Sequence, residues 1–247
     1  MRAFSIWMRL GGVALAMMAM LLPGIGIMSV AMAQDTASAT APAPAPAPLR
    51  GQGVILVLGD SLAAGAGLEI TEAFPALLEE KIRAEGWGFT VLNGGFSGDT
   101  TAGGLQRVNW LLRTKVDVLI LELGGNDGLR GISPKETREN LQGIIDRAKK
   151  KYPALEVIVA GMQMPPNMGD DYTTAFRKVF PDIAEANKAP LIPFLLEGVG
   201  GHPELNQPDR IHPTAEGHKI VANNVWVVLK PLLEKRLAAA QTGAAVR

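Results

Sequence analysis

Three residues in this sequence have the types and the local settings that nucleophilic catalysis needs. Ser61 lies in a Gly-Asp-Ser segment, and His212 has Asp209 three residues before it and a proline directly after it. A serine hydroxyl is a weak nucleophile until a neighbouring base takes its proton. On a tight turn, the Asp209 carboxylate can accept a hydrogen bond from one ring nitrogen of His212, which leaves the other nitrogen free to face Ser61. The pattern predicts a serine-histidine-aspartate triad, with a turn serine and a helix-capping aspartate as the non-catalytic alternative.

Gly98 and Asn126 are candidates for a second task, the stabilisation of negative charge. Attack on an acyl carbonyl builds charge on its oxygen, and preorganised N–H donors there contribute roughly 3–4 kcal/mol each. A glycine lets its backbone N–H approach closely, and an asparagine side chain offers two donors. We predict that both residues join the Ser61 N–H in an oxyanion hole, although glycine and asparagine are also common turn residues. Three acidic residues beside them are expected to brace the loops as hydrogen-bond acceptors: Asp60, Asp99 and Asp127.

The apolar pattern of the chain predicts the elements that must hold these residues. Continuous apolar runs, typical of strands buried on both faces, occur at 54–58, 116–121 and 157–160, with weaker ones at 89–92 and 191–192. Helical patterns occur at 74–83, 101–112, 134–150, 172–187 and 215–237. The alternation of strands and helices favours an α/β fold with a parallel sheet covered on both faces.

The candidate residues fall where such a sheet places functional sites. Ser61, Gly98 and Asn126 follow the first, second and third predicted strands, and His212 comes just before the last helix. Ligands of parallel α/β sheets bind beyond the carboxyl ends of the strands. We therefore expect these loops to meet at one edge of the sheet.

Composition and charge exclude several classes of protein. The 24 basic residues balance the 24 acidic residues, so no basic footprint for nucleic acid is present. The 47% share of hydrophobic residues is too high for a largely disordered chain. The absence of cysteine excludes a thiol nucleophile, a disulfide framework and a zinc ribbon. With only three histidines, of which His202 is expected in an exposed loop and His218 on the surface or in packing, we predict neither a metal nor a cofactor.

The N-terminal segment is predicted to lie outside the folded domain. Residues 1–33 combine arginines, an uncharged apolar stretch and an Ala-Met-Ala ending, which is the pattern of a secretory signal peptide. Export to the periplasm or the medium is therefore expected, with a retained membrane anchor as the alternative. An Ala/Pro-rich linker is predicted at 34–50, the catalytic domain at 51–238 and a C-terminal tail at 239–247.

Four motifs together resemble a known family. GDSLAAG (59–65), NGGFSGDT (93–100), GGND (124–127) and DRIHP (209–213) occur in this order, and the chain is similar to the SGNH (GDSL-type) hydrolase superfamily. Within it, the resemblance is to the multifunctional thioesterase I, lysophospholipase L1 and arylesterase group. The resemblance implies a three-layer α/β/α sandwich with a mostly parallel, five-stranded, flavodoxin-like sheet.

The resemblance also implies roles for individual residues. Ser61 matches the nucleophile, His212 the base and Asp209 its orienting acid, while Gly98 and Asn126 match the remaining oxyanion-hole positions. The implied activity is hydrolysis of acyl or aryl esters, lysophospholipids or acyl thioesters, with transient contact to membrane lipid. Arg210 stands where this group usually has glycine, which leaves the triad intact and bears on substrate preference.

Two apolar segments are expected to hold the acyl or aryl group of the substrate. The candidates are Met162, Met164, Phe194 and Leu195, since methionines adapt to varied apolar shapes. Ordinary core packing is the alternative for all four.

Other readings of the motifs fit less well. A metallophosphoesterase needs an Asp-x-His near the first strand, an α/β-hydrolase needs Gly-x-Ser-x-Gly, and a dinucleotide site needs a third glycine after the first strand; none of these patterns is present. The remaining alternative is a catalytically inactive ligand-binding module on the same fold.

Overall fold

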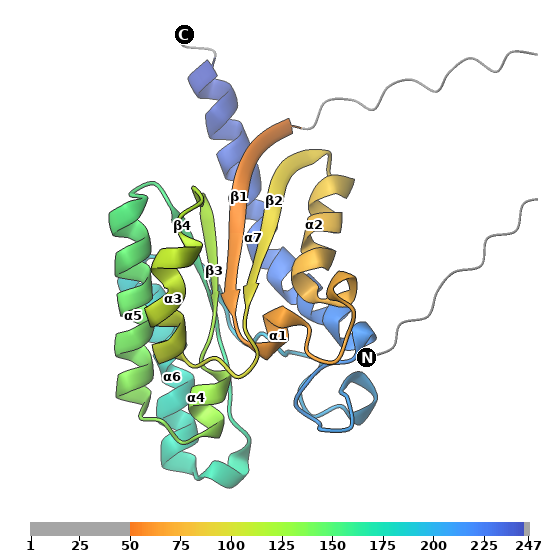
Figure 1. The fold of residues 1–247 in the computed structure, drawn as a ribbon, viewed down its shortest axis with the longest axis vertical. Coiled ribbons are helices and arrows are strands. Elements are labelled where there is room, and N and C mark those ends of the chain that lie inside the picture. The colour runs from red at the N-terminus through yellow and green to blue at the C-terminus, as the bar shows by residue number, and fades with distance from the viewer. Residues whose placement is uncertain (1–49, 245–247) are drawn as a thin grey trace, which may run out of the picture. The chain divides into compact units, whose positions relative to one another are not determined.

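The structure of this chain is a computed structural model that describes residues 50–244 (Figure 1). The predicted signal peptide, residues 1–33, and all but the last residue of the predicted linker lie outside the described residues. That last residue, Arg50, already belongs to the first strand. None of the helices within 50–244 is both long enough and apolar enough to cross a bilayer.

Five parallel strands form one sheet. They are β1 (Arg50–Gly59), β2 (Trp87–Gly95), β3 (Val118–Glu122), β4 (Glu156–Ala160) and β5 (Leu191–Ile192). The order across the sheet is β2-β1-β3-β4-β5, and every neighbouring pair runs parallel. The predicted α/β fold with a five-stranded parallel sheet is confirmed, and each predicted apolar run coincides with a strand.

Helices cover both faces of this sheet. They are α1 (Ser61–Ala64), α2 (Phe74–Ala84), α3 (Thr101–Leu111), α4 (Gly125–Leu129), α5 (Pro134–Lys151), α6 (Asp170–Asn187) and α7 (Ala215–Ala244), with short 3₁₀ turns at Ile70–Glu72, Pro166–Met168 and Pro203–Leu205. Figure 1 shows α3 and α5 on one face of the sheet and α2 and α7 on the other. The three layers follow because each strand is apolar on both sides and needs a cover on each.

Local sequence explains some of the helix ends. The Thr100 side chain accepts a hydrogen bond from the Gly103 N–H at the start of α3. Pro134 opens α5, where a missing N–H costs nothing, although the Ser133 hydroxyl makes no capping bond there. The last helix departs from the prediction. It continues to Ala244 rather than ending at Leu237, so most of the predicted tail is helical.

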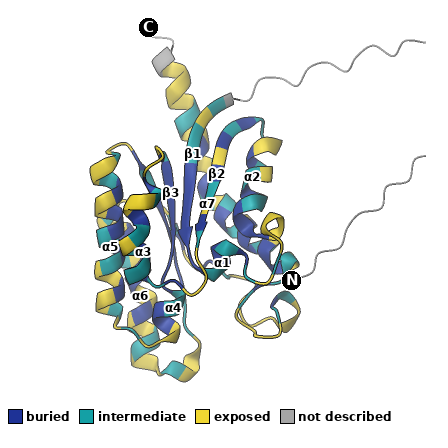
Figure 2. Cartoon of the chain, in the orientation of Figure 1, coloured by how far each residue is buried: buried dark blue, intermediate teal, exposed yellow. Residues whose placement is uncertain are grey.

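The core lies between the sheet and its two helical layers (Figure 2). Its largest fully buried side chains are three phenylalanines and aliphatic residues of the strands and helices: Phe74, Phe176, Phe180, Ile55, Leu56, Leu58, Leu78, Ile82, Leu112, Leu119, Ile120 and Leu121. In Figure 2 the central strands are dark blue along much of their length, as expected for a sheet with both faces covered. A rigid sheet therefore sets the positions of the loops at its edge.

Candidate active site

The register of the three central strands brings the predicted motifs to one edge of the sheet. Gly59, the last residue of β1, is paired with Gly95 of β2 on one side and with Glu122 of β3 on the other. The segments that follow these three residues carry Ser61, Gly98 and Asn126. As predicted, the glycine-containing loops emerge side by side beyond the carboxyl ends of the strands.

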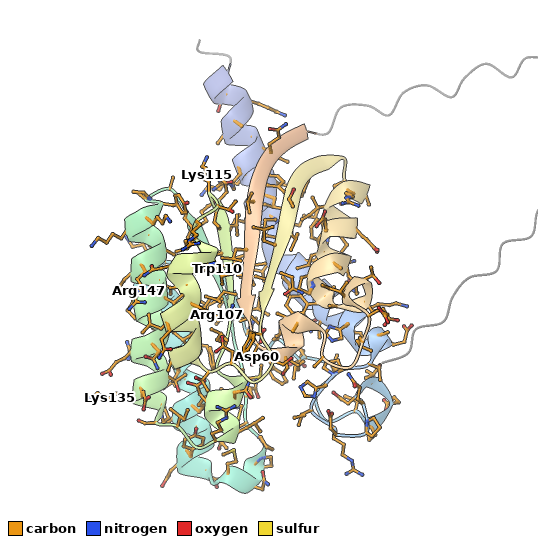
Figure 3. All side chains as sticks on the ribbon, in the orientation of Figure 1. Asp60, Arg107, Trp110, Lys115, Lys135 and Arg147 are labelled. Carbon is orange, nitrogen blue, oxygen red and sulfur yellow. The ribbon has the colours of Figure 1, made fainter. Side chains whose placement is uncertain are left out.

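Ser61 begins a four-residue helix directly after β1. Asp60 is its N-cap, and the Asp60 carboxylate accepts a hydrogen bond from the Leu62 N–H at 3.0 Å. Asp60 is almost fully buried, and Figure 3 shows it at the end of the strand. The sequence predicted a glycine-rich turn here and not a helix, because four residues are too few to show helical periodicity.

The loop that carries His212 is tied to the loop after α1. The backbone N–H of Gln207 donates to the His212 carbonyl at 2.7 Å, and Asn206 and Pro213 form an isolated antiparallel bridge. The Gln207 side chain reaches across to donate to the Ala66 carbonyl at 2.7 Å. Gly67 permits this approach, since a Cβ there would lie 2.2 Å from the Gln207 amide oxygen. These contacts fix the histidine loop relative to Ser61.

Ser61, His212 and Asp209 form one hydrogen-bonded chain. His212 Nε2 lies 2.9 Å from Ser61 Oγ, and His212 Nδ1 lies 2.6 Å from Asp209 Oδ2. The other Asp209 oxygen accepts the backbone N–H groups of Ile211 and His212. Hydrogen bonding, first of all from the His212 ring, lowers the pKa of Asp209 to about 2. With a proton on Nδ1 donated to the ionised Asp209, Nε2 is free to take a proton from Ser61.

Asn126 lies on α4, the short helix that follows β3. Its Nδ2 donates to the buried Asp60 carboxylate at 3.2 Å, which sets the orientation of the amide and leaves a second N–H on the same nitrogen. Burial raises the pKa of Asp60 to about 6. The ends of β1 and β3 thus place the Ser61 hydroxyl and a fixed amide donor at the same site.

Gly98 lies on the loop after β2, with a φ of 80° that favours glycine. Its carbonyl accepts a hydrogen bond from the Arg130 guanidinium at 2.9 Å. Gly98, Ser61, Asn126 and His212 all line one cavity. The structure therefore gathers at one place all five residues that the motifs singled out, with Asp209 directly behind His212.

The acidic residues beside the motifs act as braces, as expected. Asp99 accepts Arg107 Nε at 2.6 Å, and Asp127 accepts both the backbone and the hydroxyl of Thr101. Arg107 also donates to the carbonyls of Gly94 and Gly59, so a single side chain of α3 ties together the ends of β1 and β2 (Figure 3).

The cavity beside Ser61 has a volume of about 600 Å³ and a largely apolar lining. Of the four residues expected to contact substrate, Met162, Met164 and Phe194 line it. Leu195 does not: its side chain is fully buried in the core, and the neighbouring Leu196 lines the cavity instead. The remaining apolar side chains of the lining are Leu62, Ala66, Leu129, Pro165, Pro166 and Ile211.

Arg210 lines the same cavity and has an unusual backbone. Its φ of 64° lies in the left-handed region, which costs a non-glycine residue about 1–2 kcal/mol. Among residues 50–244 the only ionisable residues of the lining are Asp60, His212 and Arg210. The one lasting positive charge of the cavity therefore belongs to Arg210.

Three residues of the site escaped the sequence analysis. Arg107, Gln207 and Glu122 lie on a helix, in a loop and at the end of an apolar strand, and each reaches its partners through a fold that local sequence does not show. The other two histidines behave as expected: His202 is exposed, and His218 packs in the interior. No group of three histidine, aspartate or glutamate side chains suited to a metal ion occurs within residues 50–244.

Comparisons with known proteins agree with this geometry. Residues 57–220 match the model of the GDSL-like Lipase/Acylhydrolase family. Esterase TesA of Pseudomonas aeruginosa is 42% identical over 72% of this chain and 89% of its own length. Thioesterase 1/protease 1/lysophospholipase L1 of Escherichia coli K12 is 37% identical over 72% of this chain and 84% of its own. A crystal structure of TesA superposes with a TM-score of 0.70 at 42% identity, covering 72% of this chain and 99% of the other.

The matched segment runs from the last three residues of β1 through β5 and includes every motif residue, so the likeness extends through the fold and its loops. Fold, motifs and relatives lead to the same assignment. This chain belongs to the GDSL-like lipase/acylhydrolase family of carboxylic ester hydrolases.

Proposed function

We propose that this protein hydrolyses apolar acyl esters and acyl thioesters, including lysophospholipids, with Ser61 as the nucleophile. The hydrogen-bonded chain from Ser61 through His212 to Asp209 carries the proposal. Similarity to an esterase and to a thioesterase/lysophospholipase supports the substrate class. We also propose export, because residues 1–33 have the pattern of a signal peptide, and an exported enzyme would meet extracytoplasmic lipid.

The reaction runs through an acyl-enzyme. His212 Nε2 takes the Ser61 proton while Oγ attacks the acyl carbonyl, and the oxygen gains negative charge. The Ser61 and Gly98 N–H groups and the second Asn126 N–H stabilise that charge. His212 then protonates the leaving alcohol or thiol. Water, giving its proton to His212, attacks the acyl-enzyme, and the returning proton restores Ser61 as the acid leaves.

The cavity suits a medium-length acyl chain. Its apolar lining includes Met162, Met164, Phe194 and Leu196, and burial of each methylene contributes about 0.8 kcal/mol. Leu129 and Ile211 line it too but are roughly half exposed, at 47% and 46%. An apolar rim around an apolar cavity favours transient contact with lipid, from which a chain can enter.

Active-site labelling tests the proposed nucleophile. We expect a fluorophosphonate to label the purified protein covalently, and Ser61→Ala to abolish both labelling and hydrolysis of p-nitrophenyl butyrate. Ser97→Ala serves as the matched control, since Ser97 lines the same cavity, and should remain labelled. Wild-type protein that neither reacts nor hydrolyses any ester would instead support the inactive ligand-binding module.

A chain-length series tests the cavity. The ratio of kcat/KM for octanoyl over acetyl p-nitrophenyl esters should exceed one, and Leu196→Asp should reduce it by about tenfold or more, because a charge then faces the chain. The acetyl ester is the internal control and should be hydrolysed at a similar rate by both proteins. Equal rates for both esters in the wild type would remove the acyl chain from this cavity.

A further inference from the structure

A buried carboxyl contacts the backbone of Asp60, the residue before Ser61, and takes no part in the reaction described above. Glu122 is the last residue of β3 and is 1% exposed. One of its oxygens, Oε2, accepts the Asp60 backbone N–H at 3.2 Å. The other, Oε1, has no hydrogen-bond partner within the described residues. A buried polar atom without a partner is costly and calls for a reason.

The chain is built to let this carboxyl approach the strand end. Gly59 precedes Asp60, and a Cβ at this position would lie 2.2 Å from Glu122 Oε2. The approach is thus tight enough that only glycine fits between the carboxyl and the backbone of β1. The sequence supplies glycine there, and the carboxyl contacts the very segment that turns from β1 into α1.

We propose that Glu122 is a positioning residue that fixes the backbone of Asp60 and, through it, the oxyanion hole. Three hydrogen bonds carry the argument. Glu122 accepts a hydrogen bond from the Asp60 N–H. The Asp60 carboxylate in turn accepts hydrogen bonds from the Leu62 N–H and from the Asn126 amide. This inference rests on the proposed function, because it assigns a role in the same reaction.

As a result, the backbone N–H groups around Ser61 differ in whether they already have an acceptor. The N–H groups of Asp60 and Leu62 donate to carboxyl oxygens of Glu122 and Asp60. No protein group within residues 50–244 accepts the N–H of Ser61. Two of the proposed oxyanion donors therefore depend on the position of Asp60. The Ser61 N–H follows Asp60 in the chain, and the Asn126 amide donates to the Asp60 carboxylate.

The role of Glu122 needs only an acceptor oxygen, which the neutral acid also provides. Burial raises its pKa well above the usual range, and the nearby Asp60 charge raises it further. The other charged groups around the pair are Asp99 and His212, which act on Asp60, and Arg107, bonded to the Gly59 carbonyl. A neutral Glu122 leaves Asp60 free to be the one anion that orients Asn126.

Three substitutions of Glu122 test the proposal. Gln keeps a neutral acceptor at the same reach, Met keeps the length without an acceptor, and Asp moves the acceptor back by one bond. The readouts are kcat and KM on p-nitrophenyl butyrate between about pH 5 and pH 8, with circular dichroism as the check on folding.

We expect E122Q to keep kcat within about threefold of the wild type with the same acid limb, since the amide reproduces the neutral acid. E122M and E122D should lose about tenfold or more in kcat with KM nearly unchanged, because the oxyanion donors act only in the transition state. The Asp variant keeps the test decisive if the Met variant does not fold. A purely structural role would lower the unfolding temperature and leave kcat of the folded protein intact.

Three results would overturn the inference: full kcat in folded E122M and E122D, a loss in E122Q as large as in E122M, or an acid limb that moves in E122Q. Each leaves the proposed function standing, provided that the wild-type enzyme is active and labelled at Ser61. An inactive wild type would instead count against the proposed function itself.

Discussion

At the scale of single residues, the candidate site is a set of fixed donors and acceptors with few free atoms. Asp209 uses both carboxylate oxygens on its own loop, and hydrogen bonding lowers its pKa to about 2. It is therefore ionised at any pH at which the protein is expected to work. Asp60 likewise uses both oxygens, one on Leu62 and one on Asn126. On the proposed function, both residues act by orienting their neighbours through these hydrogen bonds.

Removal of the Asn126 amide should reveal its share of the reaction. We expect Asn126→Ala to lower kcat by about 10²–10³ with little change in stability, because the amide donates to charge that exists only in the transition state. Asn109→Ala, at an exposed position of α3, is the control and should be indistinguishable from wild type. Steady-state kinetics on p-nitrophenyl butyrate measure this effect. A kcat within about threefold of the wild-type value would show that Asn126 is not an oxyanion donor.

At the scale of elements, the candidate site lies at the strand ends, and the end of α6 shows a separate feature that bears on stability. The last turn of α6 ends at Lys188, whose φ of 53° places a lysine in a conformation that glycine adopts freely. The Lys188 N–H still donates to the Glu185 carbonyl, so the cap forms despite the strain. Lys188 lies outside every motif, so a substitution there should change stability without changing the candidate site.

The same substitution should have opposite effects inside α6 and at its C-terminal cap. Lys188→Gly should stabilise the protein by about 1 kcal/mol, because glycine relieves the left-handed strain. Lys178→Gly, exposed within the helix, should destabilise it by about 1 kcal/mol, because it loses helix propensity. Urea unfolding measures both, and equal signs would contradict this view of the cap. Hydrolysis rates should be unchanged in each variant.

The sequence was informative about elements in proportion to their length. The longer strands and all five long helices were predictable, because an apolar pattern accumulates over many residues, whereas the two-residue β5 showed only a weak apolar run. The short helices α1 and α4 were not, although they carry Ser61 and Asn126. Motif spacing identified those residues without their local structure. Leu195 was wrong by one position, because no periodicity in an irregular loop tells which of two adjacent leucines faces a cavity.

At the scale of the whole molecule, stability responds to pH through buried ionisable groups. His218 of α7 is 1% exposed, and its Nδ1 accepts the Phe74 N–H at 3.1 Å, while its ring stacks on Phe74. Burial lowers the pKa of His218 to about 4. The unfolded chain binds this proton from about pH 6.5 downward. Protons thus favour the unfolded state, and this contribution to stability is lost as the pH falls from about 6.5 to about 4.

Asp60 opposes this trend. Its pKa is raised to about 6, so the folded state binds its proton before the unfolded state does, and stability rises as the pH falls through that range. A comparison of variants separates the two effects. The free energy of unfolding of His218→Asn should fall less between about pH 7 and about pH 5 than that of the wild type, although its absolute value is lower. Urea unfolding at both pH values measures this, and parallel curves would exclude His218 as the source.

The hydrogen bond between Ser61 and His212 spans 151 positions of the chain, and every strand after β1 is made between them. During synthesis, the alcohol therefore emerges long before the imidazole that activates it. On the proposed function, a polypeptide that ends at β5 contains the nucleophile without its base. Such incomplete molecules cannot hydrolyse the lipids of the cell that makes them, and activity arises only when the loop with His212, just before α7, has packed beside Ser61.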